Sequence, residues 1–265
     1  MLIRSLLSLL FTSLLLLTPS VSALDLDIMS STPMGSWSLR EEITTDHKGR
    51  QTVTVTKTSL LDKEERNGQT YFWMEMSMDT FKLKKGKRKK TGDHMIMKSL
   101  VAESMLTGDP ANAMQNLRGF GEEVIVKSGK NKPMRMQGAG SFAQGMLQGM
   151  GAEIKYDFRE QGKETVSVPA GEFDTRVLQG TGSTEMKVLF KKIKVSSSST
   201  AYYSEKIPFG LVKVDGESTT NGKKSTHNSV LLEYGSSGAQ SEITEEVEDM
   251  PDMPAMPNMK DLFGG

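Results

Sequence analysis

Residues 165–173 read Thr-Val-Ser-Val-Pro-Ala-Gly-Glu-Phe, and this stretch decides the fold class. Thr165 to Val168 alternates polar and apolar side chains, as a strand does when one of its faces is buried. Pro169-Ala170-Gly171 then forms a tight turn, because proline fixes φ and glycine adopts conformations closed to other residues. Phe173 to Leu178 resumes the strand pattern. The stretch therefore predicts an antiparallel β-hairpin.

The same two-residue period recurs on both sides of this hairpin. Asn67-Gly68, a strong turn dipeptide, separates two such runs in the first half of the chain. In another run, Trp37, Leu39, Glu41 and Ile43 share one face of a strand. About ten strands can be counted by this pattern. They cover residues 37–43, 53–55, 71–78, 154–158, 165–168, 173–178, 186–195, 201–204, 209–214 and 230–234.

Helical spacing is confined to the middle of the chain. Lys98 to Leu106 and Ala111 to Leu117 predict two short helices, the second started by Asp109-Pro110. Residues 138–151 repeat Gly, Met, Gln and Ala, which is compatible with a loose amphipathic helix or a mobile flap. Strands on both sides of a short helical insertion predict a mainly β fold of the α+β class, with a mainly antiparallel sheet and helices on one side.

The N-terminus has the pattern of a secretory signal peptide. Arg4 precedes an apolar run from Leu6 to Leu17, which a proline-containing stretch closes. This run is shorter than the roughly 20 residues that cross a bilayer as a permanent helix. Small side chains up to Ala23 predict cleavage between Ala23 and Leu24, so we expect residues 1–23 to be removed.

The composition excludes several kinds of site. Its 33 basic residues balance its 33 acidic residues, so bulk charge identifies no partner. The absence of cysteine excludes disulfides, a thiol nucleophile and zinc–thiolate sites. His47, His94 and His227 are far apart in sequence, and no metal-binding, nucleophile-elbow or phosphate-binding motif is present. We therefore predict that the protein is not an enzyme and carries no cofactor.

From residue 237 the composition changes to an acidic, methionine- and proline-rich tail. Ordering costs about 1–2 kcal/mol per residue, and residues 237–265 can bury too little to offset it, so we expect a disordered tail. Deletion of residues 242–265 should then leave thermal stability unchanged. Tail methionines recur every three residues, the period of a polyproline helix, and thioethers select Cu(I). The candidate metal ligands are Met250, Met253, Met256 and Met259, with a low-complexity tail as the alternative.

The densest charge feature follows one predicted strand and precedes another. It predicts either a solvated hairpin loop or a peripheral contact with an anionic membrane, where each cation contributes about 1 kcal/mol. Nucleic acid is not expected as a partner, because no aromatic side chains interleave with the cations. The cluster consists of Lys82, Lys84, Lys85, Lys87, Arg88, Lys89 and Lys90.

Methionine is unusually abundant, with 19 residues in the chain. Thioether side chains are adaptable and line promiscuous apolar surfaces. We expect a subset to line a core or a cavity, namely Met74, Met76, Met78, Met95, Met97, Met146 and Met150.

A second motif follows the hairpin at residues 165–173. Tyr203-Ser204 is followed by Ile207-Pro208-Phe209-Gly210-Leu211-Val212-Lys213. The two motifs together resemble a recurring pair in exported bacterial proteins that are similar to the superfamily of the periplasmic lipoprotein carrier LolA and its receptor LolB. Gly35-Ser36-Trp37 and Tyr71-Phe72-Trp73-Met74-Glu75 fit the same group.

This resemblance implies an open antiparallel half-barrel closed over by helices, with an apolar cavity between them. We accordingly expect residues 24–236 to form one LolA-like domain, soluble in the periplasm of a Gram-negative-type envelope. By analogy of fold, such a protein binds an apolar or amphiphilic ligand such as a lipid, or an envelope protein, as a carrier does. The alternatives are copper handling by the methionine-rich tail and a non-catalytic structural interaction module.

Overall fold

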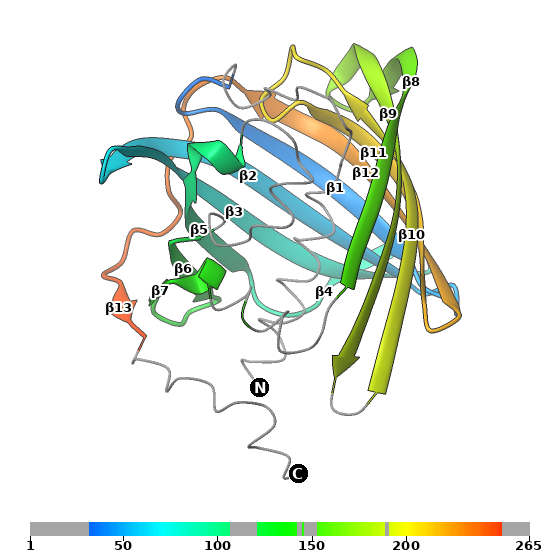
Figure 1. The fold of residues 1–265 in the computed structure, drawn as a ribbon, viewed down its shortest axis with the longest axis horizontal. Helices are drawn as coiled ribbons and strands as arrows, with labels where there is room; N and C mark the ends of the chain where they lie inside the picture. Colours follow the sequence, from blue (N-terminus) through cyan, green and yellow to red (C-terminus); the bar gives the residue numbers. More distant parts are fainter. Residues whose placement is uncertain (1–31, 107–120, 142–144, 146–152, 189–190, 251–265) are drawn as a thin grey trace.

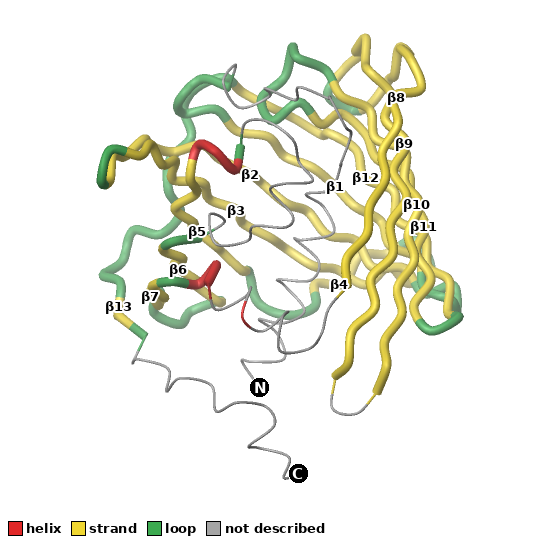
Figure 2. Tube along the Cα trace, in the orientation of Figure 1, coloured by secondary structure: helices red, strands yellow, loops and turns green. Residues whose placement is uncertain are grey.

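A computed structural model describes residues 32–106, 121–141, 145, 153–188 and 191–250. Strands dominate these residues and form one strongly curved sheet (Figures 1 and 2). A single 3-10 turn, η1 (Glu103–Met105), follows the fifth strand. The strands are β1 (Trp37–Thr45), β2 (Gln51–Arg66), β3 (Gln69–Lys84), β4 (Lys87–Lys90), β5 (Met95–Ala102), β6 (Glu123–Ser128), β7 (Met134–Gln137), β8 (Glu153–Val168), β9 (Gly171–Val188), β10 (Lys191–Tyr203), β11 (Leu211–Thr220), β12 (Lys223–Gly235) and β13 (Glu248–Asp249).

The sheet is open, as the resemblance to half-barrel proteins implies. Its strands follow the order β13-β7-β6-β5-β3-β2-β1-β12-β11-β10-β9-β8, and β4 pairs with β3 off this path. Neighbouring strands are antiparallel, except that β13 runs parallel to β7. Because β8 and β13 stand at opposite ends of the order and do not pair, the described sheet does not close into a barrel.

Tight turns join the long strands into hairpins. Asn67-Gly68, Lys85-Gly86 and Asn221-Gly222 each place two successive residues at positive φ, as a two-residue type I′ turn requires. In the 165–173 stretch, Val168 of β8 lies opposite Gly171 of β9, so Pro169-Ala170 is a two-residue turn. The hairpin predicted from this stretch is therefore confirmed.

The two sequence motifs meet in one part of the core. Phe173, from the first motif, is buried together with Ile207 and Val212 from the second, and with Leu231 of β12. The ring of Phe173 also meets Tyr234 edge to face, with the ring centroids 5.9 Å apart. Each buried side chain of this size contributes about 1.5–3 kcal/mol, so this cluster fastens the end of the β8–β9 hairpin to β11 and β12.

The predicted helix at Lys98–Leu106 is wrong for most of its length. Residues up to Ala102 belong to β5, which pairs with β3 on one side and β6 on the other. Leu100 is fully buried in this position, and only Glu103–Met105 is helical. Strand pairing on two sides has overridden the local helical spacing. Residues 111–117 and most of 138–151 lie outside the described residues.

The prediction of a disordered tail from residue 237 is wrong for residues 237–250. Together with Ser236 they form a connected segment, which we call the C-terminal strap (residues 236–250). The strap leaves the end of β12, crosses the sheet and ends beside β7 (Figure 1). Residues 251–265 lie outside the described residues.

Candidate functional site

The register of the sheet gathers methionines from three strands on one face. Met76 of β3 lies directly opposite Met97 of β5. Met97 lies opposite Val126 of β6, which lies opposite Met134 of β7. Residues directly opposite each other in an antiparallel ladder point to the same face. We call this the methionine face; on these strands it carries Phe72, Met74, Met76, Met78, Met95, Met97, Val124, Val126, Met134 and Met136.

Arg40 of β1 belongs to the same face. It lies opposite Thr56 of β2, which lies opposite Met78 of β3, so these residues form one row across the sheet. The guanidinium reaches in the other direction, where Nη1 donates to the backbone carbonyl of Leu211 at 2.5 Å. Nη2 donates to Ser229 Oγ at 2.8 Å. The arginine head is thus held over β12 and β11, on the same face of the sheet as the methionines but on the other side of β1 from them.

No carboxylate neutralises Arg40 within ion-pair distance among the described residues. Glu42 shares its face, but its carboxylate accepts a hydrogen bond from Thr44 Oγ1 at 3.0 Å instead. Burial lowers the pKa of Arg40 to about 10, against the opposing effects of Tyr203 and Glu42. Burial likewise raises the pKa of Tyr203 to about 12. A guanidinium has five N–H donors, so Arg40 keeps donors for an anionic group.

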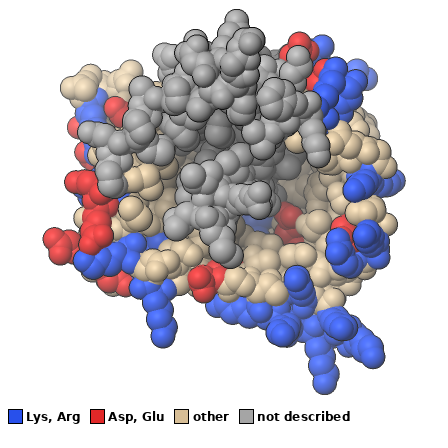
Figure 3. Space-filling model, turned by 90° about the horizontal axis from the view of Figure 1, so that it is seen from below, with Lys and Arg blue, Asp and Glu red and all other residues tan. Residues whose placement is uncertain are grey.

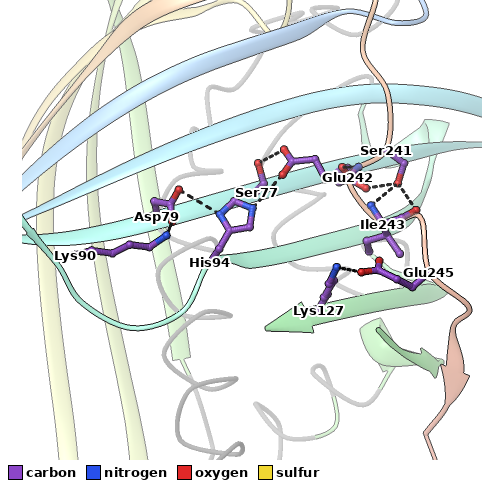
Figure 4. A network of polar contacts seen from close by, with 10 residues as sticks. Ser77, Asp79, Lys90, His94, Lys127, Ser241, Glu242, Ile243 and Glu245 are labelled. Carbon is purple, nitrogen blue, oxygen red and sulfur yellow. Dashed lines mark hydrogen bonds and ion pairs between the residues drawn. The ribbon is translucent and has the colours of Figure 1, made fainter. Parts of the chain in front are cut away.

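On the opposite face of β3, the polar residues Glu75, Ser77 and Asp79 lie beside the C-terminal strap (Figure 4). Glu75 is only 2% exposed, although it is a carboxylate on a sheet surface. It accepts a hydrogen bond from Ser241 Oγ at 2.6 Å and another from the backbone N–H of Glu242 at 2.8 Å. Because successive strand residues point to opposite faces, Glu75 lies on the reverse of Met74 and Met76. The strap therefore covers the side of the sheet away from the methionines.

His94 links the strap to β3 through two carboxylates (Figure 4). Its Nδ1 lies 3.2 Å from Asp79 Oδ2, and its Nε2 lies 3.0 Å from Glu242 Oε2. Ser77 Oγ also donates to Glu242 Oε1, at 2.6 Å. Burial alone would raise the pKa of both carboxyls, but the donors outweigh it, so the pKa of Asp79, which Lys90 also contacts, and that of Glu242 lie below their ordinary values. Both carboxylates are therefore ionised at neutral pH, and an imidazolium can donate to each of them.

Further ion pairs continue along the strap to the border of the sheet. Glu245 pairs with Lys127 of β6, and Glu248 pairs with Lys132. At the end, β13 pairs with β7, and the backbone N–H of Met250 donates to the carbonyl of Arg135 at 2.8 Å. The strap is thus attached by acidic side chains to cations of β6 and β7 and to side chains in the loops before β5 and β7.

The basic cluster forms the β3–β4 hairpin, which confirms the predicted hairpin. Its seven cationic side chains are all exposed. Figure 3 shows lysine and arginine side chains gathered along the lower border of that view. The predicted contact with an anionic membrane stays a prediction.

The other residues singled out by sequence do not come together. His94 joins the network described above, whereas His47 follows β1 and His227 lies within β12. In the described part of the chain, no group of three or more His, Cys, Asp or Glu side chains could hold a metal ion. Met250 lies at the end of the strap, and Met253, Met256 and Met259 lie outside the described residues. So do Met146, Met150 and the predicted cleavage site at Ala23 and Leu24.

No helix among the described residues is long and apolar enough to cross a membrane. No family model matches the chain, and no curated protein matches it.

Two solved structures are similar to the chain. One is a candidate lipoprotein from Parabacteroides distasonis, with a TM-score of 0.36 and 15% identity over 77% of this chain and 96% of that one. The other is a candidate exported protein with a YmcC-like fold from Bacteroides fragilis, with a TM-score of 0.34 and 15% identity over 77% of this chain and 97% of that one. The resemblance to the LolA and LolB superfamily stays a prediction.

Sequence reasoning assigned no role to Arg40 or Glu75. A signal for Arg40 was present, because the alternation that puts Trp37 and Leu39 on one face puts Arg40 on the other. Its hydrogen-bond partners in β11 and β12 are 171 and 189 residues away in sequence, so its environment could not be read locally. The same holds for Glu75, which meets the strap 166 residues further on.

Proposed function

We propose that the protein is an exported, carrier-type protein that binds an amphiphilic ligand on the methionine face, with the anionic group of the ligand at Arg40. The observation that carries the proposal is the row formed by Arg40, Thr56 and Met78, because it puts the methionines and an arginine that has no carboxylate partner among the described residues on one face of the sheet. A molecule with one apolar part and one anionic end matches both features.

The methionine face suits the apolar part of such a ligand. Unbranched thioether side chains adapt to irregular shapes and make an apolar surface that tolerates different ligands. Burial of one methylene group gains about 0.8 kcal/mol, so a chain of about ten carbons could gain about 8 kcal/mol before the cost of association. Met76 opposite Met97 and Met78 opposite Met95 extend this surface across two strands.

Arg40 suits the anionic end. Guanidinium groups bind carboxylate and phosphate with paired N–H donors, and such charge-assisted bonds are about twice as strong as neutral ones. Its two bonds to the carbonyl of Leu211 and to Ser229 Oγ orient the group without neutralising it. The site is therefore preorganised for an anion rather than occupied by an internal one.

Two fluorescent probes test this proposal: cis-parinaric acid, an anionic fatty acid, and N-phenyl-1-naphthylamine, a neutral apolar amine. The protein should bind both, and an added fatty acid should displace them. In the variant Arg40→Gln, affinity for the anionic probe should fall about 10- to 100-fold, which corresponds to losing about 1.5–3 kcal/mol of a charge-assisted bond. Affinity for the neutral probe should stay unchanged, and this result would show that the variant is folded.

The matched control is Arg159→Gln, which removes an exposed arginine of β8 whose one ion pair among the described residues is with Asp157, at 3.2 Å. It should change neither affinity. Equal binding of the anionic probe by the parent and Arg40→Gln would refute the role of Arg40. If the parent showed no displaceable binding of either probe, the chain would be better described as a structural interaction module.

A further inference from the structure

The methionine face of β3 changes its chemistry along the strand. Every second residue from Phe72 to Met78 is apolar, Thr80 follows, and Lys82 and Lys84 complete the same side. β3 has no register break against β4, where Lys82 lies opposite Lys89 and Lys84 lies opposite Lys87. One face of the β3–β4 hairpin therefore carries two directly opposed lysine pairs, the lysine array (Lys82, Lys84, Lys87 and Lys89).

The reverse face of the same hairpin is electrically balanced. Arg88 pairs with Glu41 of β1 at 2.7 Å, and Lys90 pairs with Asp79 of β3 at 2.6 Å. In contrast, none of the ion pairs among the described residues includes a member of the lysine array. The uncompensated charge of the hairpin is thus concentrated on one side, the side that continues the methionine face.

Two opposed lysine pairs lower the stability of the hairpin unless an anionic partner binds them. Like charges directly opposite each other destabilise an antiparallel pair. The hairpin cannot relieve the repulsion by opening at its tip, because Lys85 and Gly86, at φ of 51° and 73°, form a tight type I′ turn. The array is consequently a fixed cationic patch, two strands wide, which an external anionic partner would neutralise.

We propose that the lysine array binds the headgroups of anionic phospholipids and so docks the cationic end of the methionine face on a membrane surface. A lipid surface presents anionic groups in a plane and apolar chains just beneath them, in the same order as Lys82 and Met78 along β3. The signal-peptide pattern of residues 1–23 predicts export, and an exported chain meets membrane surfaces rather than nucleic acid. The docking itself requires no ligand; only its purpose, to bring the methionine face to a lipid source, rests on the proposed function.

Sedimentation with vesicles tests the docking. The protein should sediment with vesicles of phosphatidylglycerol and phosphatidylcholine and should stay in solution with phosphatidylcholine alone, and added salt should weaken its binding. The array variant carries Lys→Gln at residues 82, 84, 87 and 89. Since each cation near an anionic surface is worth about 1 kcal/mol, or about fivefold, its partition should fall roughly a few hundredfold.

The control variant makes the same change of charge at exposed lysines outside the hairpin that, like the array, form no ion pair among the described residues, namely Lys48, Lys130, Lys155 and Lys223. It should lose far less binding than the array variant. The array variant should also melt no lower than the parent, because it removes two like-charged pairs. Equal loss of binding in both variants would show that only net charge matters and would overturn the proposal.

Two further outcomes distinguish membrane docking from phosphate binding and from ligand binding on the methionine face. Release from vesicles by inorganic phosphate, at matched ionic strength, would identify the array as a site for free phosphate and overturn membrane docking. The array variant should still bind cis-parinaric acid, and Arg40→Gln should still bind the vesicles. A failure of ligand binding and a failure of docking are therefore seen in different variants.

Discussion

The hydroxyl of Ser241 provides the sharpest test of the C-terminal strap. Ser241→Ala removes one of the two hydrogen bonds that Glu75 accepts from the strap, at 2.6 and 2.8 Å. Glu75 is 2% exposed, so water does not readily replace the lost donor. The substitution therefore leaves a carboxylate with one strap donor in a site that excludes solvent.

The expected loss can be estimated from this geometry. A hydrogen bond to a charged group contributes about 1.5–3 kcal/mol. For a domain of this size, 1 kcal/mol corresponds to about 2–4 °C in Tm, so Ser241→Ala should melt about 3–12 °C below the parent. This contrasts with the expectation from sequence, in which removal of residues 242–265 leaves stability unchanged.

Thermal unfolding followed by circular dichroism, together with hydrogen exchange of the strap amides, measures the effect. Faster exchange at Glu242 and Ile243 should accompany the lower Tm, because the Ser241 hydroxyl also interacts with the backbone of Ile243. The matched control is Ser237→Ala, an exposed serine of the same strap. If Ser241→Ala and Ser237→Ala melted together with the parent and exchanged at the same rate, the strap would not be a stabilising element.

Two other predictions follow from the strap network and from the packing of the sheet. The pKa of Glu242 lies below its ordinary value of 4.5, so the stabilisation that this carboxylate gives the strap is present above that pH and is lost as the pH falls through the lowered pKa. Strap amides should therefore lose protection from hydrogen exchange below about pH 4.5, while the amides of β9 and β10 stay protected. Uniform protection down to pH 3 would contradict this. Gly180→Ala should lower the free energy of unfolding by about 1–3 kcal/mol, measured by urea denaturation, because a Cβ there would lie 2.3 Å from Cε1 of the buried Phe158 ring. Gly145→Ala should not lower it, because no described atom lies within 4 Å of a Cβ at that position. Equal stability of the two variants would show that the Phe158 ring moves freely aside.

The local parts of the fold could be predicted from the sequence. The turn at Pro169-Ala170 and the alternation on both sides of it need only neighbouring residues, and the hairpin is found as predicted. The register of β1 against β2 runs without a shift, which agrees with the alternation predicted from Trp37 to Ile43. The mainly β, antiparallel architecture follows from the number and spacing of such runs, whereas the prediction of an open sheet rested on the resemblance to half-barrel proteins.

Parts that depend on distant partners could not be predicted. Lys98 to Leu106 satisfies helical spacing locally, and only the pairing of β5 with β3 and β6 makes it a strand. The strap has few apolar residues, so its composition predicts disorder, yet Glu75 and the cations of β6 and β7 supply its attachments from far away in sequence. The candidate site at Arg40 shows the same division, since alternation fixes its face and the rest of the chain supplies its partners.

The parallel pairing of β13 with β7 also bears on how copies of this chain behave toward one another. The outermost strand of an open sheet offers unpaired N–H and C=O groups to any extended segment that it meets, and is a starting point for aggregation. At one border, Glu248 and Asp249 occupy these groups on β7 and add negative charge. At the other border, β8 is rich in charged side chains and is interrupted by a bulge between Glu160 and Gly162. Both borders thus discourage the addition of a foreign strand, and a sheet that never closes on itself can stay confined to one molecule.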